Sequence, residues 1–424
     1  MRSLYNLLTE LSSPVLGVLG AFSPKMKAFV KGRKGLFAKL EKQMNGKSPA
    51  IWMHCASLGE YEQGLPVLEA IRAQYPHLSI VVSFFSPSGY EVKHQSAEAD
   101  VVTYLPLDTR ANAKRFLDLV NPVMAIFVKY EVWPNYYMEL QDRGIPNLLI
   151  SALFRSDQAF FKKRGRLLRG ALKSLEWIFV QNRSSLNVLN KQGFENCSLS
   201  GDTRFDRVSR QIEIDNSLDF MEHFKGEHKL LVVGSSWPED EPLFLDFVLT
   251  KSEEGLKTVI APHSMNEKGI ERLQAVLGDK ACRYTQASEE QLASCMVLIL
   301  DTVGYLSKVY SYADIAYVGG GMGTSGLHNI LEPATFGVPI LIGKNYSNFP
   351  EAVKLRELAG LYSVAKTEEF KELAGRLYTD SKFRNQTGMI CEHYVNSNTG
   401  ATREIMSYIA KSHGDRLIQI ASKG

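Results

Sequence analysis

This chain of 424 residues lacks several features that would reveal a function at once. Its five cysteines are scattered and form no C-x-x-C pair, which is typical of reduced, mostly buried thiols in a cytosolic compartment. The histidines show no metal-ligand spacing, and no Asp-x-Asp pair follows an expected strand, so we expect neither a metal nor another cofactor. The net charge of +3 does not argue for nucleic acid as a partner.

The N-terminal segment differs from the rest in composition. Residues 4–22 are largely apolar with one charge, at Glu10, and seven Lys or Arg residues follow within residues 25–42. The apolar stretch is near the minimum length that spans a bilayer, and the basic flank would attract anionic lipid. We expect residues 1–47 to be a membrane anchor that spans the bilayer or lies in its interface. The alternative is an amphipathic helix packed on the protein.

Length and patterning predict an α/β protein of two domains. Short apolar runs alternate with amphipathic stretches over residues 48–205 and again over residues 230–424, with a polar segment between them, at 206–229, that is interpreted as a linker. Each alternation predicts a doubly wound, Rossmann-like domain with a parallel sheet. The final helix, expected near residues 402–421, can pack back on the N-terminal domain. Two such domains would face a cleft, with ligands beyond the carboxyl ends of the strands.

The expected elements are as follows. Strands are predicted at residues 51–55, 78–85, 101–105, 123–128, 147–152, 177–181, 230–234, 258–261, 297–300, 315–318 and 339–342. Helices are predicted at residues 64–74, 111–120, 135–143, 184–192, 243–250, 267–276, 305–312, 327–335 and 352–358.

The first informative motif is Ile-Trp-Met-His-Cys-Ala-Ser-Leu-Gly-Glu at residues 51–60. It carries Glu60 from a strand to the start of a helix, where a carboxylate can act as a general base on a bound hydroxyl. Ser57 and Glu60 also have the spacing of a capping box, so Glu60 could equally serve the helix backbone. Spacing alone favours capping.

A second acid, Glu131, follows the strand at residues 123–128, beside Trp133. A carboxylate next to a bulky ring can be buried, with a raised pKa. A polar turn residue before a helix is an equally good interpretation.

Two segments of the second half are suited to binding an anion. Gly-Ser-Ser-Trp at residues 234–237 places Ser235 and Ser236 before a helix, although an ordinary capped helix fits as well. Residues 319–326 are glycine-rich but match no dinucleotide or P-loop motif, and glycines such as Gly320 and Gly321 allow a ligand close to the backbone. Asn329 and Glu332 follow, and Glu332 can accept hydrogen bonds from a ribose diol or interact with the helix dipole.

Basic and aromatic residues are interleaved over residues 154–173. This pattern favours a surface for an anionic amphiphile such as a phosphorylated lipid. RNA and a plain solvated helix face are the alternatives.

Four motifs in this order resemble the 3-deoxy-D-manno-octulosonic acid (Kdo) transferases of lipopolysaccharide synthesis. They are Ser-Leu-Gly-Glu at 57–60, Glu-Val-Trp-Pro-Asn at 131–135, Gly-Asp-Thr-Arg-Phe-Asp at 201–206 and His-Asn-Ile-Leu-Glu-Pro at 328–333. The resemblance implies a glycosyltransferase B fold and inverting transfer of Kdo from CMP-Kdo to a lipid A precursor (lipid IVA). It also implies a location at the cytoplasmic side of the inner membrane.

The resemblance also implies roles for single residues. Glu60 would be the general base, and Glu131 and Arg204 would stabilise the transition state. The substrate-binding set would comprise Ser57, Gly59, Ser235, Ser236, Pro262, His263, Val303, Gly304, Tyr305, Gly320, Gly321, Asn329, Ile330, Leu331 and Glu332.

The chain departs from the family pattern at several of these positions. Arg204 stands where the family usually has Lys, and the two cations differ in geometry. Residues 262–264 read Pro-His-Ser instead of Pro-Arg-His, residues 326–329 read Gly-Leu-His-Asn instead of Gly-Gly-His-Asn, and Lys129 replaces an acid.

Two other functions remain open from the sequence. One is another nucleotide-sugar enzyme of the same fold, such as an epimerase. The other is a two-domain binding protein without chemistry, because the fold alone does not name a function.

Overall fold

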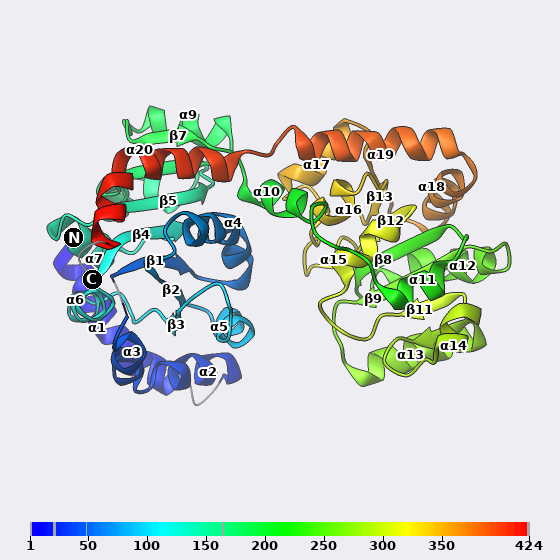
Figure 1. Ribbon diagram of the computed structural model, residues 1–424, viewed down its shortest axis with the longest axis horizontal. Helices are drawn as coiled ribbons and strands as arrows, with labels where there is room; N and C mark the ends of the chain where they lie inside the picture. Colours follow the sequence, from blue (N-terminus) through cyan, green and yellow to red (C-terminus); the bar gives the residue numbers. More distant parts are fainter. Residues whose placement is uncertain (1, 20–22, 48, 163–164, 422–424) are drawn as a thin grey trace. The chain divides into compact units, whose positions relative to one another are not determined.

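The chain divides into two compact units in the computed structural model, which describes residues 2–19, 23–47, 49–162 and 165–421. Unit 1 comprises Met1–Arg207 and Thr399–Gly424, and unit 2 comprises Val208–Asn398 (Figure 1). Each unit contains one parallel sheet of seven strands. The predicted α/β class with two parallel sheets is therefore confirmed.

The sheet of unit 1 has the strand order β3-β2-β1-β4-β5-β6-β7. Its strands are β1 (Ala50–Cys55), β2 (Ser79–Phe84), β3 (Val101–Tyr104), β4 (Pro122–Val128), β5 (Asn147–Ala152), β6 (Trp177–Val180) and β7 (Cys197–Leu199). Its helices are α1 (Arg2–Leu19), α2 (Pro24–Arg33), α3 (Leu36–Met44), α4 (Leu58–Gln74), α5 (Pro87–Lys93), α6 (Arg110–Val120), α7 (Pro134–Asp142), α8 (Arg166–Lys173), α9 (Arg183–Lys191) and α20 (Ala401–Ala421), and α10 (Thr203–Arg210) crosses into unit 2.

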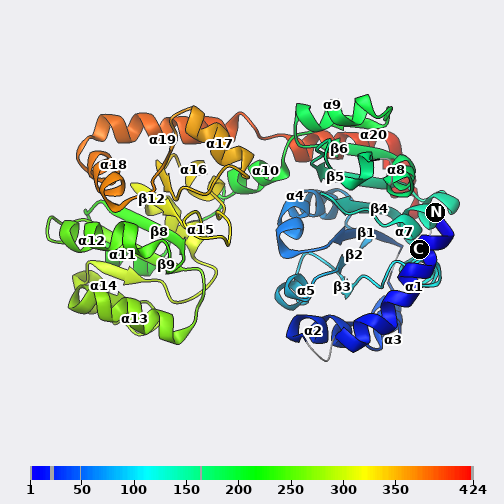
Figure 2. The same ribbon diagram turned by 180° about the vertical axis from the view of Figure 1, so that it is seen from behind.

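Both faces of this sheet are buried, because helices cover each of them. Successive side chains of a strand point to opposite faces. In β1, Trp52 joins the apolar cluster formed with α6, α7 and α8, whereas Ile51 and Met53 join the cluster formed with α4 and α20. Helix α20 packs beside α4 (Figures 1 and 2). The carboxyl ends of β1 and β4 lie side by side as a result of their pairing.

The sheet of unit 2 has the order β10-β11-β9-β8-β12-β13-β14. Its strands are β8 (Leu230–Ser236), β9 (Lys257–Pro262), β10 (Ala281–Arg283), β11 (Val297–Ile299), β12 (Ile315–Val318), β13 (Ile340–Ile342) and β14 (Leu361–Ser363). Its helices are α11 (Asp219–Lys225), α12 (Glu241–Ser252), α13 (Glu267–Leu277), α14 (Glu289–Ser294), α15 (Leu306–Val309), α16 (Leu331–Thr335), α17 (Pro350–Glu357), α18 (Thr367–Thr379) and α19 (Ser381–Asn396).

Every strand predicted from the sequence is present within a few residues of its expected bounds, and the short strands β7, β10 and β14 were missed. Each of these three has only three residues and includes a polar one, whereas the equally short β11 and β13 are wholly apolar and were predicted. Helix α4 begins six residues before its predicted start, because Ser57 caps it. The range 206–229, interpreted as an irregular linker, contains the end of α10 and all of α11.

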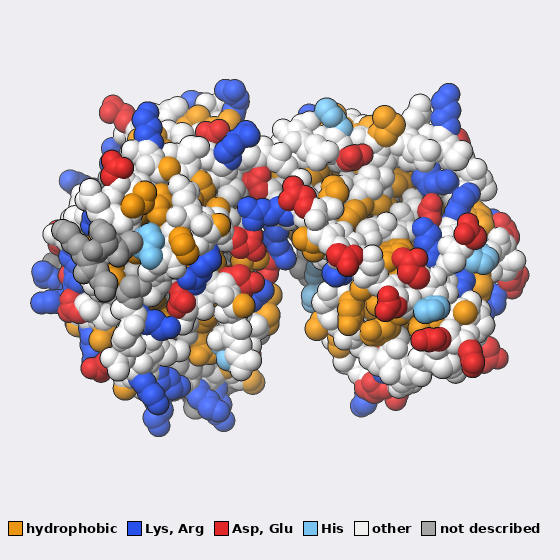
Figure 3. All heavy atoms as spheres, viewed as in Figure 1, with side chains coloured by type: hydrophobic (Ala, Val, Ile, Leu, Met, Phe, Trp, Pro, Cys, Tyr) orange, Lys and Arg blue, Asp and Glu red, His pale blue; other side chains and the backbone are white. Residues whose placement is uncertain are grey.

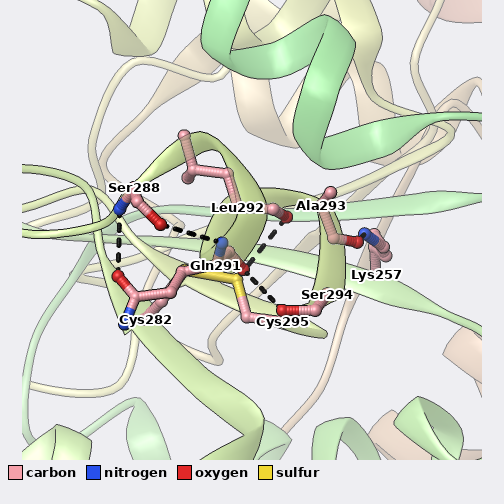
Figure 4. Close-up of a disulfide and its surroundings, with 8 residues drawn as sticks. All are labelled: Lys257, Cys282, Ser288, Gln291, Leu292, Ala293, Ser294 and Cys295. Carbon is pink, nitrogen blue, oxygen red and sulfur yellow. Dashed lines mark hydrogen bonds between the residues drawn. A yellow bond between two sulfur atoms is a disulfide. The ribbon is translucent and has the colours of Figure 1, made fainter.

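The cysteines depart from expectation at one pair. Cys282 in β10 and Cys295 after α14 form a disulfide, with Cα atoms 6.1 Å apart (Figure 4). The crossover through α14 returns the chain beside β10, because β10 and β11 pair in parallel. The interpretation of all five cysteines as reduced thiols is therefore wrong for this pair, whereas Cys55, Cys197 and Cys391 are free.

The N-terminal segment folds as helices against unit 1. Within the described residues, none of the helices combines the length and the apolar character that crossing a bilayer requires. Residue 1 and residues 20–22 of the predicted anchor lie outside the described residues. The Tyr5 hydroxyl donates a hydrogen bond of 2.6 Å to Asp108, which fixes α1 to the loop after β3.

Candidate functional site

Glu60 lies in the first turn of α4, directly after the carboxyl end of β1. Ser57 is the N-cap, and its backbone N–H donates to Glu60 Oε2 at 3.1 Å. The capping box predicted from the spacing is therefore formed. Gly59 lies between the two partners, with open space where a side chain would begin. One carboxylate oxygen of Glu60 thus serves the helix.

The electrostatic surroundings of Glu60 are unusual for a capping residue. The side chain is buried, and burial together with the nearby charge of Glu131 raises the pKa of Glu60 to about 7. The backbone N–H groups of Ala56 and Ser57 and the charge of Lys129 act in the opposite direction. A carboxylate with a pKa near neutrality is suited to take and release a proton.

Glu131 follows β4, next to β1 in the sheet, at the turn into α7. The Trp133 indole N–H donates to Glu131 Oε2 at 2.8 Å, and His54 Nε2 lies 3.4 Å from the same oxygen. The chain enters this turn at Lys129, whose φ of 70° lies in the left-handed region. The structure therefore brings Glu60 and Glu131 together, because the strands that precede them, β1 and β4, are neighbours in the sheet.

Arg204 lies in α10, after the edge strand β7. Its guanidinium donates to Asp202 Oδ2 at 2.9 and 2.7 Å. The preceding residue, Thr203, donates to the backbone carbonyl of Gln63 in α4. The helix that carries Arg204 thus lies against the helix that carries Glu60.

In unit 2, the end of β8 and the glycine segment after β12 are in close contact. Ser235 has a φ of 53°, and a side chain at Gly319 would collide with the Ser235 carbonyl, 2.3 Å away. Gly320 has a φ of 88°, which only glycine adopts readily, and its N–H donates to the buried Asp240 at 2.9 Å. The glycines here allow backbone segments to approach each other. Gly321 likewise abuts Gly343.

Three rings stack at the carboxyl ends of the central strands of unit 2. His263 follows Pro262 at the end of β9 and stacks on Trp237, with ring centroids 4.4 Å apart. His328 lies 4.4 Å from His263 and accepts a hydrogen bond of 3.1 Å from the Trp237 indole. Burial lowers the pKa of His263, and burial with the neighbouring His263 lowers the pKa of His328 to about 4. Both imidazoles are therefore neutral at physiological pH.

Asn329 and Glu332 follow His328 in the sequence and are linked by a hydrogen bond. Asn329 donates to Glu332 Oε1 at 3.1 Å and accepts from the Leu331 N–H at 3.1 Å, and Ser307 donates to Glu332 Oε2 at 3.0 Å. The Ile330 and Leu331 side chains are buried in the core. Helix α16 starts at Leu331, four residues after its predicted start, so Asn329 lies in the preceding loop.

The turn at residues 303–305 lies just before Ser307, whose hydroxyl donates to Glu332. Val303 is exposed, and Gly304 has a φ of 96°. The Tyr305 ring packs against Phe220 and Tyr284, with which it lines a cavity of about 400 Å³.

Four residues of these two sites were not singled out from the sequence. Trp237, His328 and Asp240 organise the strand ends of unit 2, and His54 lies against Glu131. Trp237 and His328 each stood inside a motif that was noted, but one sequence cannot show that their rings meet. His54 also lies inside the motif at residues 51–60, but its partners Ser83 and Glu131 come from other parts of the chain.

The family profile described as "3-Deoxy-D-manno-octulosonic-acid transferase (kdotransferase)" matches residues 30–207. A 3-deoxy-D-manno-octulosonic acid transferase of Haemophilus influenzae is 26% identical, with 96% of this chain and 98% of the relative covered. The enzyme of that name from Chlamydia trachomatis serovar D is 30% identical, with 76% of this chain and 77% of the relative covered.

Among solved structures, the UDP-GlcNAc 2-epimerase of Neisseria meningitidis bound to UDP-GlcNAc has a TM-score of 0.62 at 15% identity. The match covers 86% of this chain and all of the epimerase chain (100%). MurG of Acinetobacter baumannii has a TM-score of 0.52 at 14% identity and covers 86% of this chain. These likenesses show a shared two-domain α/β fold.

Proposed function

This chain belongs to the 3-deoxy-D-manno-octulosonic-acid (Kdo) transferase family, and on that premise we propose that it transfers Kdo from CMP-Kdo to a lipid A precursor. The reaction would belong to the inner-core stage of lipopolysaccharide synthesis. The observation that carries this proposal is Glu60, a buried carboxylate at a strand end whose pKa is raised to about 7 beside a second acid.

The proposed mechanism is an inverting displacement. A hydroxyl oxygen of the acceptor attacks the anomeric carbon of Kdo, the bond from that carbon to the CMP phosphate breaks, and the electron pair leaves with CMP. Glu60 takes the proton of the attacking hydroxyl, a contribution of about 10²–10⁴-fold to the rate. Glu131 would stabilise the positive charge that develops on the sugar. Arg204 would also stabilise the transition state.

The donor would bind to unit 2. Glu332 is held by Asn329 and Ser307 and has the acceptor oxygens that a ribose diol requires. The neutral Trp237–His263–His328 stack offers a hydrogen-bonding aromatic surface at the ends of β8 and β9. Where the family usually has Arg, His263 would replace a permanent charge by a neutral ring.

The acceptor is a lipid, and the N-terminal helices have a surface suited to a membrane. Four leucines of α1 recur along one helix face and are exposed: Leu4, Leu7, Leu8 and Leu11. Exposed lysines follow on α2 and α3 and between them, where Figure 3 shows Lys and Arg side chains. They are Lys27, Lys31, Lys34, Lys39 and Lys42. We place the protein at the cytoplasmic side of the inner membrane, with α1 lying in the interface.

The basic segment at residues 154–173 is a second surface of unit 1 suited to an anionic lipid. Arg155, Lys162, Arg166 and Lys173 are exposed around α8, whereas Lys163 and Arg164 lie outside the described residues. We interpret this surface as a contact for the anionic acceptor.

A transfer assay with CMP-Kdo and tetra-acylated lipid A precursor tests the function directly. Wild type should transfer Kdo, and Glu60→Gln should lower kcat by about 10²–10⁴-fold while CMP binding, measured by calorimetry, stays unchanged. Glu69→Gln on the same helix is the matched control and should keep normal activity. Near-normal turnover of Glu60→Gln would reduce Glu60 to a helix cap, and absence of transfer by wild type would reject the proposed reaction.

A further inference from the structure

His54 is a polar residue in the core of unit 1, and one of its ring nitrogens lacks a hydrogen-bond partner among the described residues. It lies in the central strand β1 and is 0% exposed. Its Nδ1 faces Ser83 of the neighbouring strand β2, at 2.9 Å from Oγ and 3.1 Å from the carbonyl oxygen. Within the described residues, its buried Nε2 has no hydrogen-bond partner, and the nearest anion is Glu131 Oε2 at 3.4 Å. Buried polar atoms without partners are rare and call for an explanation.

The position of the imidazole proton follows from the direction of the neighbouring hydrogen bonds. An indole N–H can only donate, so the bond of 2.8 Å from Trp52 Nε1 makes Ser83 Oγ an acceptor. The hydroxyl keeps one proton to donate, and His54 Nδ1 is the atom in reach. With Nδ1 as acceptor, a neutral imidazole must carry its proton on Nε2.

The opposite tautomer fits less well. A proton on Nδ1 could bond to the Ser83 carbonyl, but the Ser83 hydroxyl would then lose its acceptor. The lone pair of Nε2 would face the Glu131 carboxylate, so two acceptors would confront each other in a buried place.

We propose that His54 is a positioning residue: its neutral ring, oriented by Trp52 and Ser83, donates an Nε2–H hydrogen bond to the Glu131 carboxylate. Trp133 already donates to Glu131 Oε2 at 2.8 Å, and its ring packs edge-on against His54 with centroids 5.4 Å apart. Two N–H groups therefore converge on one oxygen and leave Oε1 for the substrate. The contact of 3.4 Å would shorten once substrate fills the site, as catalytic hydrogen bonds commonly do.

This arrangement has a consequence for the other carboxylate. The charge of Glu131 is one of the causes that raise the pKa of Glu60. By fixing where that charge lies, the series Trp52–Ser83–His54–Glu131 also sets the surroundings of Glu60. The catalytic part of this inference rests on the proposed function, whereas the hydrogen bond itself does not.

The tautomer can be read without any substrate. Protein labelled with ¹⁵N in its histidine rings is recorded by long-range ¹H–¹⁵N correlation, and His54→Gln identifies the His54 signal by its disappearance. We expect a neutral ring with the proton on Nε2. A proton on Nδ1, or on both nitrogens, overturns the proposal. If Nε2–H is observed in a protein that transfers no Kdo, the proposed function fails while the hydrogen-bond series stands.

Variants of Ser83 test the positioning role. Ser83→Ala removes the hydroxyl that directs the ring, and we expect kcat to fall by about 10- to 100-fold with KM for CMP-Kdo unchanged. Ser83→Thr keeps a hydroxyl and should restore most of kcat and the Nε2–H tautomer. The other histidine signals report whether each variant is folded. An unchanged kcat and tautomer in folded Ser83→Ala overturns the proposal.

Discussion

At the residue scale, Glu60 is the group whose ionisation should limit activity. Its pKa is raised to about 7, and a general base acts only when deprotonated, so kcat/KM should fall about tenfold per pH unit below that value. Lys129 lowers the pKa of Glu60. Lys129→Gln should therefore raise that pKa, move the acidic limb of the pH profile to higher pH and leave the activity on the alkaline plateau intact.

Initial rates across the pH range provide the measurement. Lys191→Gln, at an exposed position of α9, is the control and should keep the wild-type profile. An acidic limb that stays in place in Lys129→Gln would show that Glu60 does not set it.

The same residue shows what a single sequence can and cannot predict about a site. The spacing of Ser57 and Glu60 predicted a capping box, and the box is formed. That spacing could not show that Glu131 lies near enough to raise the pKa of Glu60, because the two acids meet only through the pairing of β1 with β4. His54 was invisible for the same reason: its partners come from β2 and from the turn after β4.

At the scale of elements, long periodic segments were predictable and short or locally determined ones were not. Strands β5 and β12 have the bounds expected from their apolar runs. The start of α16 was misplaced because residues 327–330 continue the apolar pattern, while the Asn329 side chain caps the Leu331 N–H. Local hydrogen bonding of this kind decides where a helix begins.

Arg33 at the end of α2 shows that a charge pattern does not predict which basic side chains face the solvent. The sequence placed it in a basic flank suited to lipid, but its guanidinium turns inward and donates to the carbonyls of Leu105 at 3.0 Å and Phe85 at 2.8 Å. It also lies 3.6 Å from the Phe29 ring centroid. Desolvation lowers the pKa of Arg33 to about 10, which still leaves it charged at neutral pH.

Arg33 should therefore matter for stability. Arg33→Met keeps the length and apolar contact but leaves two backbone carbonyls without their donor, and it should lower the free energy of unfolding of unit 1 by about 2–4 kcal/mol. Denaturant unfolding followed by tryptophan emission measures the loss, since Trp52, Trp133 and Trp177 belong to unit 1. The exposed Lys34→Met is the control, and equal stability of the two variants would contradict a structural role for Arg33.

At the scale of the whole molecule, the remaining question is how a chain without a bilayer-crossing helix among its described residues would reach a lipid acceptor. The exposed fractions of Leu4, Leu7, Leu8 and Leu11 are 60%, 53%, 58% and 53%. Because these side chains share one face of α1, they can enter the interface together, while the lysines of α2 and α3 meet anionic headgroups.

Replacing these four leucines by Gln should lower partition onto vesicles that contain anionic lipid by at least about tenfold, because four exposed side chains lose their transfer free energy. Sedimentation with the vesicles measures the bound fraction. The control, Ile212→Gln with Ile214→Gln, removes apolar side chains that are 47% and 51% exposed in unit 2 and should bind as wild type does. Vesicles of zwitterionic lipid should bind wild type more weakly, because the lysines then contribute little. Equal binding of the leucine variant and wild type would mean that α1 does not hold the protein at the membrane.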